Sequence, residues 1–512
     1  MTLGTKVDAS DGATFELGGT AARTHQAIIA GGGPTGLMLA GELALAGVDV
    51  AIIERRESQD LAGMRAGGLH MRTLEVLDQR GLGERFVSQG QRHQVAPFHE
   101  VLLDVSDFPT RRNYFLALPQ NQIERTLAEW VEELGVRLYR GCEVARFVQD
   151  DHGVDVVLSD GSGLHASFLV GCDGSRSVVR KGAGIEFAGW EPTKSWLIAE
   201  ARWAQEPKWG VEHDLHGTYA LGKMDDPGQV RIVLAERELK TGDDPTFDEV
   251  QSLLVEVYGA DFGVHTPTWI SRFTDRCRQA AAYRDRRVLL AGDAAHIHPP
   301  MGGQGLNIGL QDAVNLGWKL AQVIKGISSE SLLDTYHAER HPVAALVLRN
   351  TMADVALQRR DPRSRALGEI MSELAVIDGA RKHLVAVRSG LGVRYDLGDG
   401  HPLVGRRLPD LRIQVGQTAQ STYDFLHDAR PVLFDFGSDL GQERRSCTDA
   451  VKVVSANALQ AWDLPVVGPV QSPEAALVRP DGYVAWAGAL GDDGLEQALQ
   501  KWFGASAADT AH

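Results

Sequence analysis

Residues 26–55 read QAIIAGGGPTGLMLAGELALAGVDVAIIER and decide the fold of the first part of the chain. The apolar run at 26–30 predicts a buried strand, the leucine spacing at 35–46 predicts a helix, and the run at 48–53 predicts a second strand. A strand, a helix and a strand in this order form a β-α-β unit, whose two strands lie parallel in one sheet. We therefore expect an ordered α/β domain from about residue 25. Residues 1–24 are rich in Gly, Ala, Ser and Thr without periodicity, which predicts a disordered tail.

Glycines fill the turn between the first predicted strand and the helix, where Gly31, Gly33 and Gly36 make a G-x-G-x-x-G pattern. In this pattern the first glycine allows a tight turn, the second lets a pyrophosphate approach the backbone, and the third lets helix and strand pack closely. The helix that starts at Pro34 and Thr35 then offers unpaired N–H groups and a partial positive charge to phosphates.

An acidic residue stands at the end of the second predicted strand, since Glu54 follows Gly36 by 18 residues. At this place a carboxylate can accept the hydrogens of both ribose hydroxyls of a dinucleotide. Arg55 and Arg56 favour a cofactor with a 2′-phosphate, whereas Glu54 would repel one. The pattern predicts a Rossmann-like dinucleotide-binding domain, and the alternative is a Gly-rich turn beside a surface glutamate.

The composition excludes several classes of function. The chain has 512 residues, with 52 Lys and Arg against 68 Asp and Glu, so its formal net charge is −16. Nucleic acids and anionic membranes need a basic face, and we expect neither as a partner. The N-terminus lacks the apolar core of a signal peptide, and no stretch is long and apolar enough to cross a membrane, which predicts a cytoplasmic protein. The four cysteines form no C-x-x-C pair, so we expect no zinc or disulfide framework.

The rest of the chain changes architecture twice. Three β-like runs between residues 194 and 236 predict a mostly antiparallel sheet, whereas a short strand at 288–291, a Gly-rich loop and a helix at about 306–325 return to the α/β pattern. A turn-rich stretch from residue 395 precedes a further small α/β domain. The expected parts are the tail, a discontinuous domain of residues 25–180 and 276–390, an inserted β-sheet domain at 181–275 that residues 80–115 can join, and a C-terminal domain at 396–512.

Three further motifs bear on the cofactor. Residues 170–180, VGCDGSRSVVR, resemble the Asp-Gly motif of flavoprotein aromatic hydroxylases, and residues 287–296, RVLLAGDAAH, resemble their Gly-Asp motif, whose Asp binds the ribitol chain of FAD. Residues 298–313, HPPMGGQGLNIGLQDA, continue the pattern. Together they are similar to the FAD- and NAD(P)H-dependent monooxygenases of the para-hydroxybenzoate hydroxylase type, over about residues 26–345. The whole chain most resembles the long bacterial members that oxidise aromatic polyketides, such as angucycline and anthracycline hydroxylases.

This resemblance implies where FAD binds. The Gly-rich loop at 302–307 opens a helix, so its N–H groups and dipole can face the N1–C2=O edge of the flavin, which becomes negative on reduction. By resemblance, His298, Pro299 and Pro300 line the flavin face, and no protein group is assigned as a catalytic acid or base. The residues expected to bind FAD are Gly31, Gly33, Pro34, Thr35, Gly36, Glu54, Arg55, Arg65, Gln120, Asp173, Gly292, Asp293, Pro300, Gly302, Gly303, Gln304, Gly305, Leu306 and Asn307.

Several of these residues have a structural alternative. Asp293 can cap the segment that follows it, Gln120 can simply start a helix, and Arg65 can be a plain surface side chain. Asp173 and Arg180, which the resemblance places near the nicotinamide, can instead only tie the domain together.

Other sites are not expected. His296 and His298 stand two residues apart in a loop without an acidic or cysteine cluster, so we predict no metal site. The segment from Gly302 to Gly305 lacks the Lys-Ser/Thr of a phosphate-binding loop, and G-x-S-x-G is absent.

The same resemblance implies the reaction. NADPH or NADH reduces FAD, oxygen then forms a flavin C4a-hydroperoxide, and an electron-rich phenol ring attacks its distal oxygen. The substrate is expected between the flavin and the sheet at about 190–275. The alternatives are a Baeyer–Villiger or antibiotic-inactivating monooxygenase on the same fold and, in another class, a non-catalytic flavin-binding module. The expected partners are a small aromatic substrate, molecular oxygen and, in a homodimer, a second copy of the chain.

Two C-terminal segments complete the resemblance. Residues 401–409, HPLVGRRLP, and 477–486, LVRPDGYVAW, look like the thioredoxin-like extension of the larger family members. With Cys447 as its single cysteine, this domain cannot cycle as a dithiol, so we expect it to be structural or to form an interface.

Overall fold

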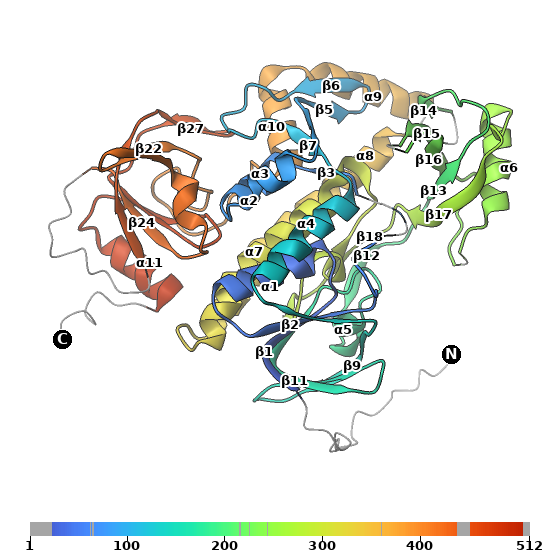
Figure 1. Cartoon of the computed structure of the whole chain (residues 1–512). Helices are drawn as coiled ribbons and strands as arrows, with labels where there is room; N and C mark the ends of the chain where they lie inside the picture. Colours follow the sequence, from blue (N-terminus) through green and yellow to red (C-terminus); the bar gives the residue numbers. More distant parts are fainter. Residues whose placement is uncertain are drawn as a thin grey trace, which may run out of the picture.

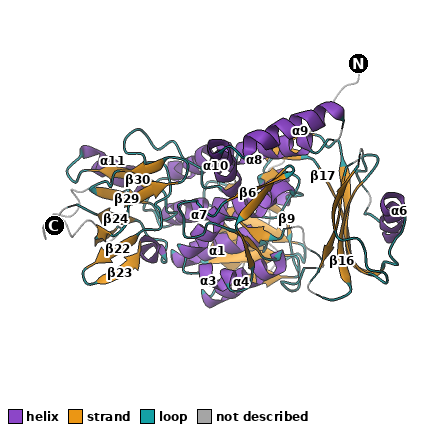
Figure 2. Ribbon diagram, turned by 90° about the horizontal axis from the view of Figure 1, so that it is seen from above, coloured by secondary structure: helices purple, strands orange, loops and turns teal. Residues whose placement is uncertain are grey.

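The chain folds into three parts that lie in a row (Figure 2): a C-terminal α/β domain, a central domain of helices around a large sheet, and an antiparallel sheet with one helix. Residues 26–55 form the predicted β-α-β unit, with β1 at Arg23–Ala30, α1 at Pro34–Leu45 and β2 at Val50–Glu54. β1 begins three residues before the predicted strand because Arg23, Thr24 and His25 already pair with β11, so Arg23 and Thr24 are not part of a disordered tail. The computed structural model describes residues 23–61, 63, 66–214, 217–224, 226–242, 244–359, 361–437 and 451–504.

The central sheet brings the sequence motifs together. Its strand order is β19-β20-β11-β1-β2-β8, with β10 and β9 added beside β11, and the strands from β20 to β8 are parallel. Parallel strands end at the same edge, so the segments that follow β1, β2, β11 and β20 meet there, which is where such sheets bind ligands. The further strands are β8 Arg137–Arg140, β9 Val144–Gln149, β10 Val154–Leu158, β11 Gly163–Gly171, β19 Arg284–Asp285 and β20 Val288–Leu290.

Helices pack on this sheet, with α1 lying between α7 and α4 (Figure 1). α7 starts two residues earlier than the sequence predicted, because left-handed backbone at Gly302 and Gly303 ends the loop there. The helices are α2 Met71–Asp78, α3 Gly83–Val87, α4 Gln120–Glu133, α5 Val178–Gly182, α7 Gln304–Ile324, α8 Asp334–Leu357, α9 Pro362–Ala375 and α10 Asp378–Ser389, with 3-10 turns at Gly292–Ala294, Met301–Gly303 and Glu330–Leu333.

The inserted sheet is antiparallel, in the order β14-β15-β16-β13-β17, and α6 packs on its apolar face. A small sheet of β12, β18 and β21 connects it to the Gly-Asp motif, because β21 begins at His296. The elements are β12 Phe187–Trp190, β13 Ser195–Arg202, β14 Gly210–His213, β15 Thr218–Lys223, β16 Gln229–Ala235, α6 Phe247–Tyr258, β17 His265–Thr274, β18 Cys277–Ala280 and β21 His296–Ile297.

Residues 80–115 do not contribute a strand to the inserted sheet. The hairpin of β5, Val95–Phe98, and β6, Val101–Asp104, packs against α9 and α10 through a separate apolar cluster. β4, Gln91–His93, pairs with β7, Phe115–Ala117, which also pairs with β3, Gly68–Leu69.

The C-terminal domain has a four-stranded core in the order β25-β24-β29-β30, covered by α11, and is thioredoxin-like as predicted. It is anchored to the central domain by Arg80, whose guanidinium pairs with Glu42 and also donates to the carbonyls of Leu426 and Pro480. Cys447 lies outside the described residues. The elements are β22 Arg412–Val415, β23 Thr418–Ser421, a 3-10 turn Thr422–Leu426, β24 Val432–Asp435, β25 Lys452–Ser455, β26 Asn457–Ala458, β27 Trp462–Leu464, β28 Gly468–Val470, β29 Ala475–Val478, β30 Val484–Gly488 and α11 Asp493–Phe503.

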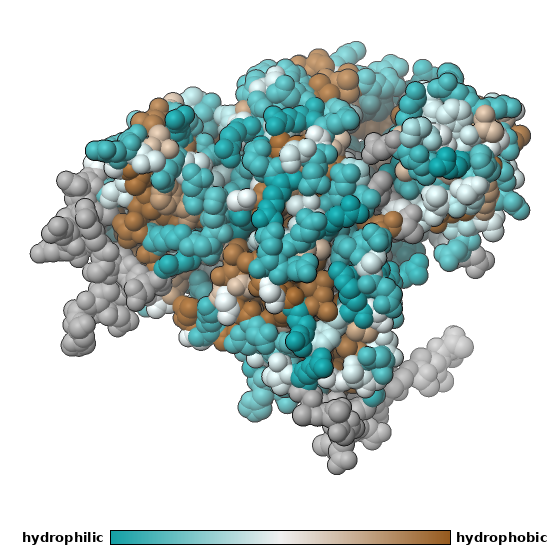
Figure 3. Space-filling model, in the orientation of Figure 1, coloured by the Kyte–Doolittle hydropathy of each residue, from teal (hydrophilic) through white to brown (hydrophobic). Residues whose placement is uncertain are grey.

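The face of the molecule drawn in Figure 3 is mostly hydrophilic, with hydrophobic atoms gathered in places, including the top of the view over α9 and α10. On α9, Leu367, Ile370 and Leu374 are exposed at helical spacing, and Val376 and Ile377 follow at its end. A contiguous apolar stripe of this kind is typical of a contact surface. Among the described residues, no helix is long and apolar enough to span a bilayer.

Candidate active site

The three glycines of the first motif are needed for three different reasons. Gly31 has a φ of +105°, and a Cβ there would lie 2.3 Å from the carbonyl oxygen of Cys172. A Cβ at Gly36 would lie 2.0 Å from the carbonyl oxygen of Gly31, where α1 approaches β1 most closely. At Gly33, in contrast, a Cβ would have no described atom within 4 Å. The backbone before Pro34, the first residue of α1, is therefore open to a ligand.

Glu54 is buried at the end of β2, facing this loop. Its Oε2 accepts a hydrogen bond from Gly32 N at 2.7 Å, and its Oε1 accepts two from Arg56, at 2.9 Å each. Burial raises the pKa of the Glu54 carboxyl, but the hydrogen bonds from Arg56 and Gly32 outweigh burial and hold the pKa below its usual value. A carboxylate has about four lone-pair positions. Arg56 Nη2 is a fourth donor, 3.5 Å from Oε2, so Glu54 accepts a ribose hydroxyl when Arg56 gives up one of its contacts.

A second carboxylate joins Gln120 to this end of the site. Buried Glu124 accepts hydrogen bonds from Arg56 and Gln59, at 2.9 and 2.8 Å, and from Gln120 Nε2 at 2.9 Å. The sequence singled out Arg56 only, with Arg55, as a sign of a 2′-phosphate, and it did not single out Glu124, because nothing in its spacing distinguishes it from a surface charge. Arg55 is exposed, so of the two adjacent arginines it is Arg56 that turns inward.

Asp173 has two differently placed carboxylate oxygens. Its Oδ2 accepts hydrogen bonds from the N–H groups of Val178 and Val179, at 2.7 and 3.1 Å, and so caps α5. Its Oδ1 is buried and accepts none from any residue that the structure describes. Arg180 donates to the carbonyl of Ala294 at 2.9 Å, which ties the Asp-Gly motif to the Gly-Asp motif. Asp173 thus has the structural role of capping α5, and its Oδ1 can accept a hydrogen bond from a hydroxyl group of a ligand.

The Gly-Asp motif packs directly on α1. Gly292 has a φ of +61°, and a Cβ there would lie 2.6 Å from Thr35 Oγ1. Asp293 follows inside a 3-10 turn whose N-cap is Ala291, so it is not the cap of that turn. Asp293 is exposed, and a Cβ built on Gly305 would lie 4.0 Å from its Oδ1. Asp293 and the first turn of α7 therefore line the same space.

His298 lies in the loop before α7 and faces the same first turn. Its Nδ1–H donates to the carbonyl of Pro299 at 2.8 Å, and a Cβ at Gly305 would lie 3.5 Å from its Nε2. Burial lowers the pKa of His298 to about 4, so the imidazole is neutral and Nε2 is a hydrogen-bond acceptor. Pro300 follows as an exposed residue.

The start of α7 is held in place by the side chain of Asn307. Gly302 and Gly303 have φ angles of +71° and +63°, which only glycine adopts without strain. Asn307 Nδ2 donates to the carbonyl of Gly303 at 2.8 Å, and its Oδ1 accepts from the N–H of His70 at 2.8 Å. The first N–H groups of a helix, here those of Gln304 to Leu306, have no partner within the helix and can point at a ligand.

Two residues beside this loop, His70 and Arg388, carried no signal in the sequence. His70 Nδ1–H donates to the carbonyl of Arg388 at 3.0 Å, and burial lowers the pKa of His70 to about 4. The Arg388 guanidinium pairs with Asp354 at 2.8 Å, and a Cβ at Gly302 would lie 3.8 Å from its Cζ. Burial raises the pKa of Asp354 although Arg388 opposes this.

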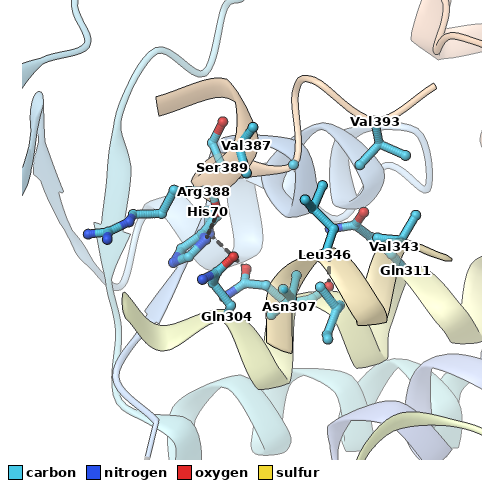
Figure 4. A pocket seen from close by; sticks show the side chains of 13 residues that line it. His70, Gln304, Asn307, Gln311, Val343, Leu346, Val387, Arg388, Ser389 and Val393 are labelled. Carbon is cyan, nitrogen blue, oxygen red and sulfur yellow. Dashed lines mark hydrogen bonds between the residues drawn. The ribbon is translucent and has the colours of Figure 1, made fainter. Parts of the chain in front are cut away.

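A small cavity lies behind the loop, between α7, α8 and α10 (Figure 4). Its volume is about 20 Å³, which is room for a water molecule. His70, Gln304 and Asn307 line one side, and Val343 and Leu346 line the other. The cavity is too small to be the substrate site.

The inserted sheet contacts the same loop from the other side. Met301 packs against the apolar core of this sheet, in which Trp196 stacks on Phe273 at 5.3 Å between ring centroids. A Cβ at Gly63 would lie 2.0 Å from the indole of Trp269 on β17, so the segment around Gly63 also lies against the sheet. Arg65 lies outside the described residues. The sheet, the loop before α7 and the segment at Gly63 thus meet where the sequence placed the substrate.

These features fit FAD. Gly33 leaves the helix N-terminus open to a pyrophosphate, and Glu54 can accept a hydrogen bond from a ribose hydroxyl in place of its 3.5 Å contact with Arg56. Asp173 Oδ1 and His298 Nε2 are buried acceptors without a partner among the described residues, as hydroxyl groups of a bound sugar chain require.

Known proteins resemble this chain along nearly its whole length. A family model described as an FAD binding domain matches residues 24–351, and one described as the C-terminal domain of aromatic-ring hydroxylases matches residues 401–506. The 12-dehydrotetracycline 5-monooxygenase/anhydrotetracycline 6-monooxygenase of Streptomyces rimosus is 43% identical over 503 residues, covering 94% of this chain and 99% of the relative. The rifampicin monooxygenase of Streptomyces venezuelae is 44% identical over 496 residues, with the same coverage.

A solved structure agrees with these matches. The OxyS anhydrotetracycline hydroxylase from Streptomyces rimosus superposes with a TM-score of 0.88 at 43% identity, covering 94% of this chain and all of that one. The chain is therefore an enzyme, which excludes the non-catalytic flavin-binding module, and its cofactors are FAD and NAD(P)H. Its motifs, its fold and its relatives agree that the chain belongs to the FAD-dependent aromatic-ring hydroxylases and is a flavin monooxygenase.

Proposed function

We propose that this monooxygenase hydroxylates a phenolic, polycyclic aromatic substrate of polyketide origin. The observation that carries the proposal is the position of the loop before α7, between the dinucleotide-binding edge of the central sheet and the inserted sheet. Met301 of this loop packs into the aromatic-rich core of the inserted sheet, while Asn307 fixes the helix start behind it. A flat, apolar ring system suits a space lined by aromatic side chains. The anhydrotetracycline-oxidising relatives support the same substrate class.

In this proposal FAD extends along the edge of the central sheet. Glu54 holds the adenosine ribose, Gly33 and the start of α1 hold the pyrophosphate, and Asp293 holds the ribitol chain. The flavin ring lies against Pro300 and the first turn of α7. When bound, FAD takes a hydride from NAD(P)H and activates oxygen for transfer to the ring.

The protein's own groups bind, orient and keep out water. The first N–H groups of α7 favour negative charge at the adjacent flavin edge, because the helix dipole is positive there. The pKa of both His70 and His298 is lowered to about 4, so both are neutral near pH 7 and the helix N-terminus, not an imidazolium, supplies the positive potential at that edge. The inserted sheet closes the other side, which protects a reactive oxygen species from water.

The test is the mass of the product formed with NADPH and air. The panel contains anhydrotetracycline, an angucycline phenol and simple phenols, each with and without NADPH. The proposal expects a gain of one oxygen, labelled when ¹⁸O₂ is supplied, with the ring skeleton kept. Gain of one oxygen as a lactone would move the assignment to Baeyer–Villiger chemistry. NADPH consumption with only hydrogen peroxide formed on every aromatic substrate would contradict the proposed substrate class.

A second candidate is modification of an antibiotic. The relative of 44% identity that is named rifampicin monooxygenase favours it. Rifampicin therefore belongs in the panel, and its oxidation at a higher kcat/KM than the polyketide phenols would favour this function over the first.

We further propose a cytoplasmic location and a homodimer in solution. The net charge of −16 supports an enzyme that stays off anionic membranes, and the apolar stripe on α9 supports a contact between copies. Light scattering on the purified enzyme gives the mass of the assembly, and a monomer at all concentrations would contradict the dimer.

A further inference from the structure

Asp312 lies on α7, fully buried, and its carboxylate joins three separate segments. Its Oδ2 accepts a hydrogen bond from the backbone N–H of Gly292 at 3.2 Å and one from His296 Nε2–H at 2.6 Å. Its Oδ1 accepts a hydrogen bond from Arg340 Nε at 2.7 Å. Gly292 and His296 stand on either side of Asp293, so a single carboxylate fixes both ends of the turn that carries Asp293.

The carboxylate of Asp312 is ionised although no water reaches it. Burial raises the pKa of Asp312, but the charge of Arg340 and the hydrogen bond from His296 outweigh burial, and the pKa lies below its usual value. A buried charge is stable only with its partners in place. The three contacts of Asp312 therefore support one another and hold the turn at both of its ends.

Arg340 connects this carboxylate to the C-terminal domain. It is buried on α8, and its other nitrogens donate to the hydroxyl of Tyr395 at 3.1 Å and to the carbonyl of Ile308 at 3.2 Å. Tyr395 stacks on Tyr483 of the C-terminal domain with 4.0 Å between ring centroids. Contacts between the buried side chains of Tyr483, Tyr395, Arg340 and Asp312 thus connect the C-terminal domain with the turn at Asp293.

We propose that Asp312 is a positioning residue for the cofactor site: held by Arg340, it fixes Asp293 in the geometry that binds FAD, and Tyr395 extends this support from the C-terminal domain. The inference rests on the proposed role of Asp293 as the ribitol-binding residue. A turn that is ordered in the free protein loses little entropy when it binds a ligand. This assigns the C-terminal domain, which has no C-x-x-C pair, a part in cofactor binding.

Two variants test the contacts that connect Tyr395, Arg340 and Asp312. Asp312→Asn keeps the size of the side chain but removes the charge that Arg340 and His296 face, and Tyr395→Phe removes only one hydroxyl. We expect the dissociation constant for FAD to rise about tenfold in Asp312→Asn and about threefold in Tyr395→Phe, because the first variant breaks a buried ion pair whereas the second removes one acceptor from an Arg340 that keeps its pair with Asp312. Hydrogen exchange of the peptide at 288–297 in the FAD-free protein should become faster in both.

Two matched controls separate positioning from general loss of stability. Glu42→Gln removes a buried carboxylate whose partner Arg80 also binds the C-terminal domain, and Tyr423→Phe removes a buried hydroxyl that donates to Leu408 in that domain. Within the described residues, the side-chain hydrogen bonds of Glu42 and Tyr423 do not reach the turn at Asp293. Each control should lower Tm as its counterpart does and leave FAD affinity and exchange at 288–297 unchanged.

The outcomes distinguish this inference from the proposed site. If Asp293→Ala binds FAD as tightly as the wild type, the assignment of Asp293 is wrong and the inference falls with it. If Asp293→Ala weakens FAD binding but Asp312→Asn and Tyr395→Phe behave like their controls, the site stands and the positioning role is refuted. Should Asp312→Asn fail to fold, Tyr395→Phe against Tyr423→Phe decides the question alone.

Discussion

Replacing Gly33 by alanine separates cofactor binding from folding. Gly33 precedes α1 with φ −78° and ψ −178°, a conformation open to any residue, and a Cβ there would have no described atom within 4 Å. The FAD-free protein should therefore keep its stability, or gain about 0.4–1 kcal/mol because alanine restricts the unfolded chain. The added methyl group would instead occupy the space into which we expect the pyrophosphate to come.

The size of the effect follows from that overlap. An extra methyl group at a packed contact costs about 1–3 kcal/mol. This corresponds to an increase of about 5- to 150-fold in the dissociation constant for FAD. The assay is a titration of FAD-free protein, followed by the quenching of flavin fluorescence, together with urea unfolding of the same preparation.

Gly379→Ala is the matched control. Gly379 lies in the first turn of α10, where a Cβ would also have no described atom within 4 Å, far from the G-x-G-x-x-G loop in the fold. It should leave FAD affinity unchanged. If Gly33→Ala binds FAD within twofold of the wild type, no pyrophosphate approaches Gly33. A loss of more than about 2 kcal/mol of stability in the FAD-free variant would show that the loop is not open.

Three further outcomes are expected. Gly36→Ala should destabilise the FAD-free protein by more than about 2 kcal/mol, because its Cβ would lie 2.0 Å from the carbonyl oxygen of Gly31, and urea unfolding measures this loss. The pKa of both His70 and His298 is lowered to about 4, so the unfolded chain binds more protons than the folded one below pH 6.5. Together the two histidines should lower the free energy of unfolding by about 2 kcal/mol when the pH falls from 6 to 5. A free energy of unfolding that does not change over this range would contradict the prediction. Arg56→Ala should lower the free energy of unfolding by about 2 kcal/mol, since it leaves two buried carboxylates without their cation. The control Arg55→Ala, at an exposed side chain, should lower it by less than about 0.5 kcal/mol in the same urea unfolding assay.

Local sequence patterns predicted the elements of the cofactor site well. The β-α-β unit, the helix that starts at Gln120 and three of the five strands of the inserted sheet are found close to their predicted positions, because hydrophobic periodicity and turn residues act over a few neighbours. The start of α7 was placed two residues late, since the periodic apolar pattern begins only at Leu306 while the glycines before it already end the loop.

The sequence by itself determined the β-α-β unit, the order of the glycine and aspartate motifs and, through them, the family. Each of these depends on residues that are adjacent or at fixed short spacing, where backbone geometry leaves few choices. Only the tertiary structure decided that Arg56 rather than Arg55 turns toward Glu54, that His70 contacts the end of α10, and that Asp312 holds both sides of Asp293. These contacts join residues on different elements, and the direction of each side chain is set by the packing of helices and strands around it rather than by its neighbours in the chain.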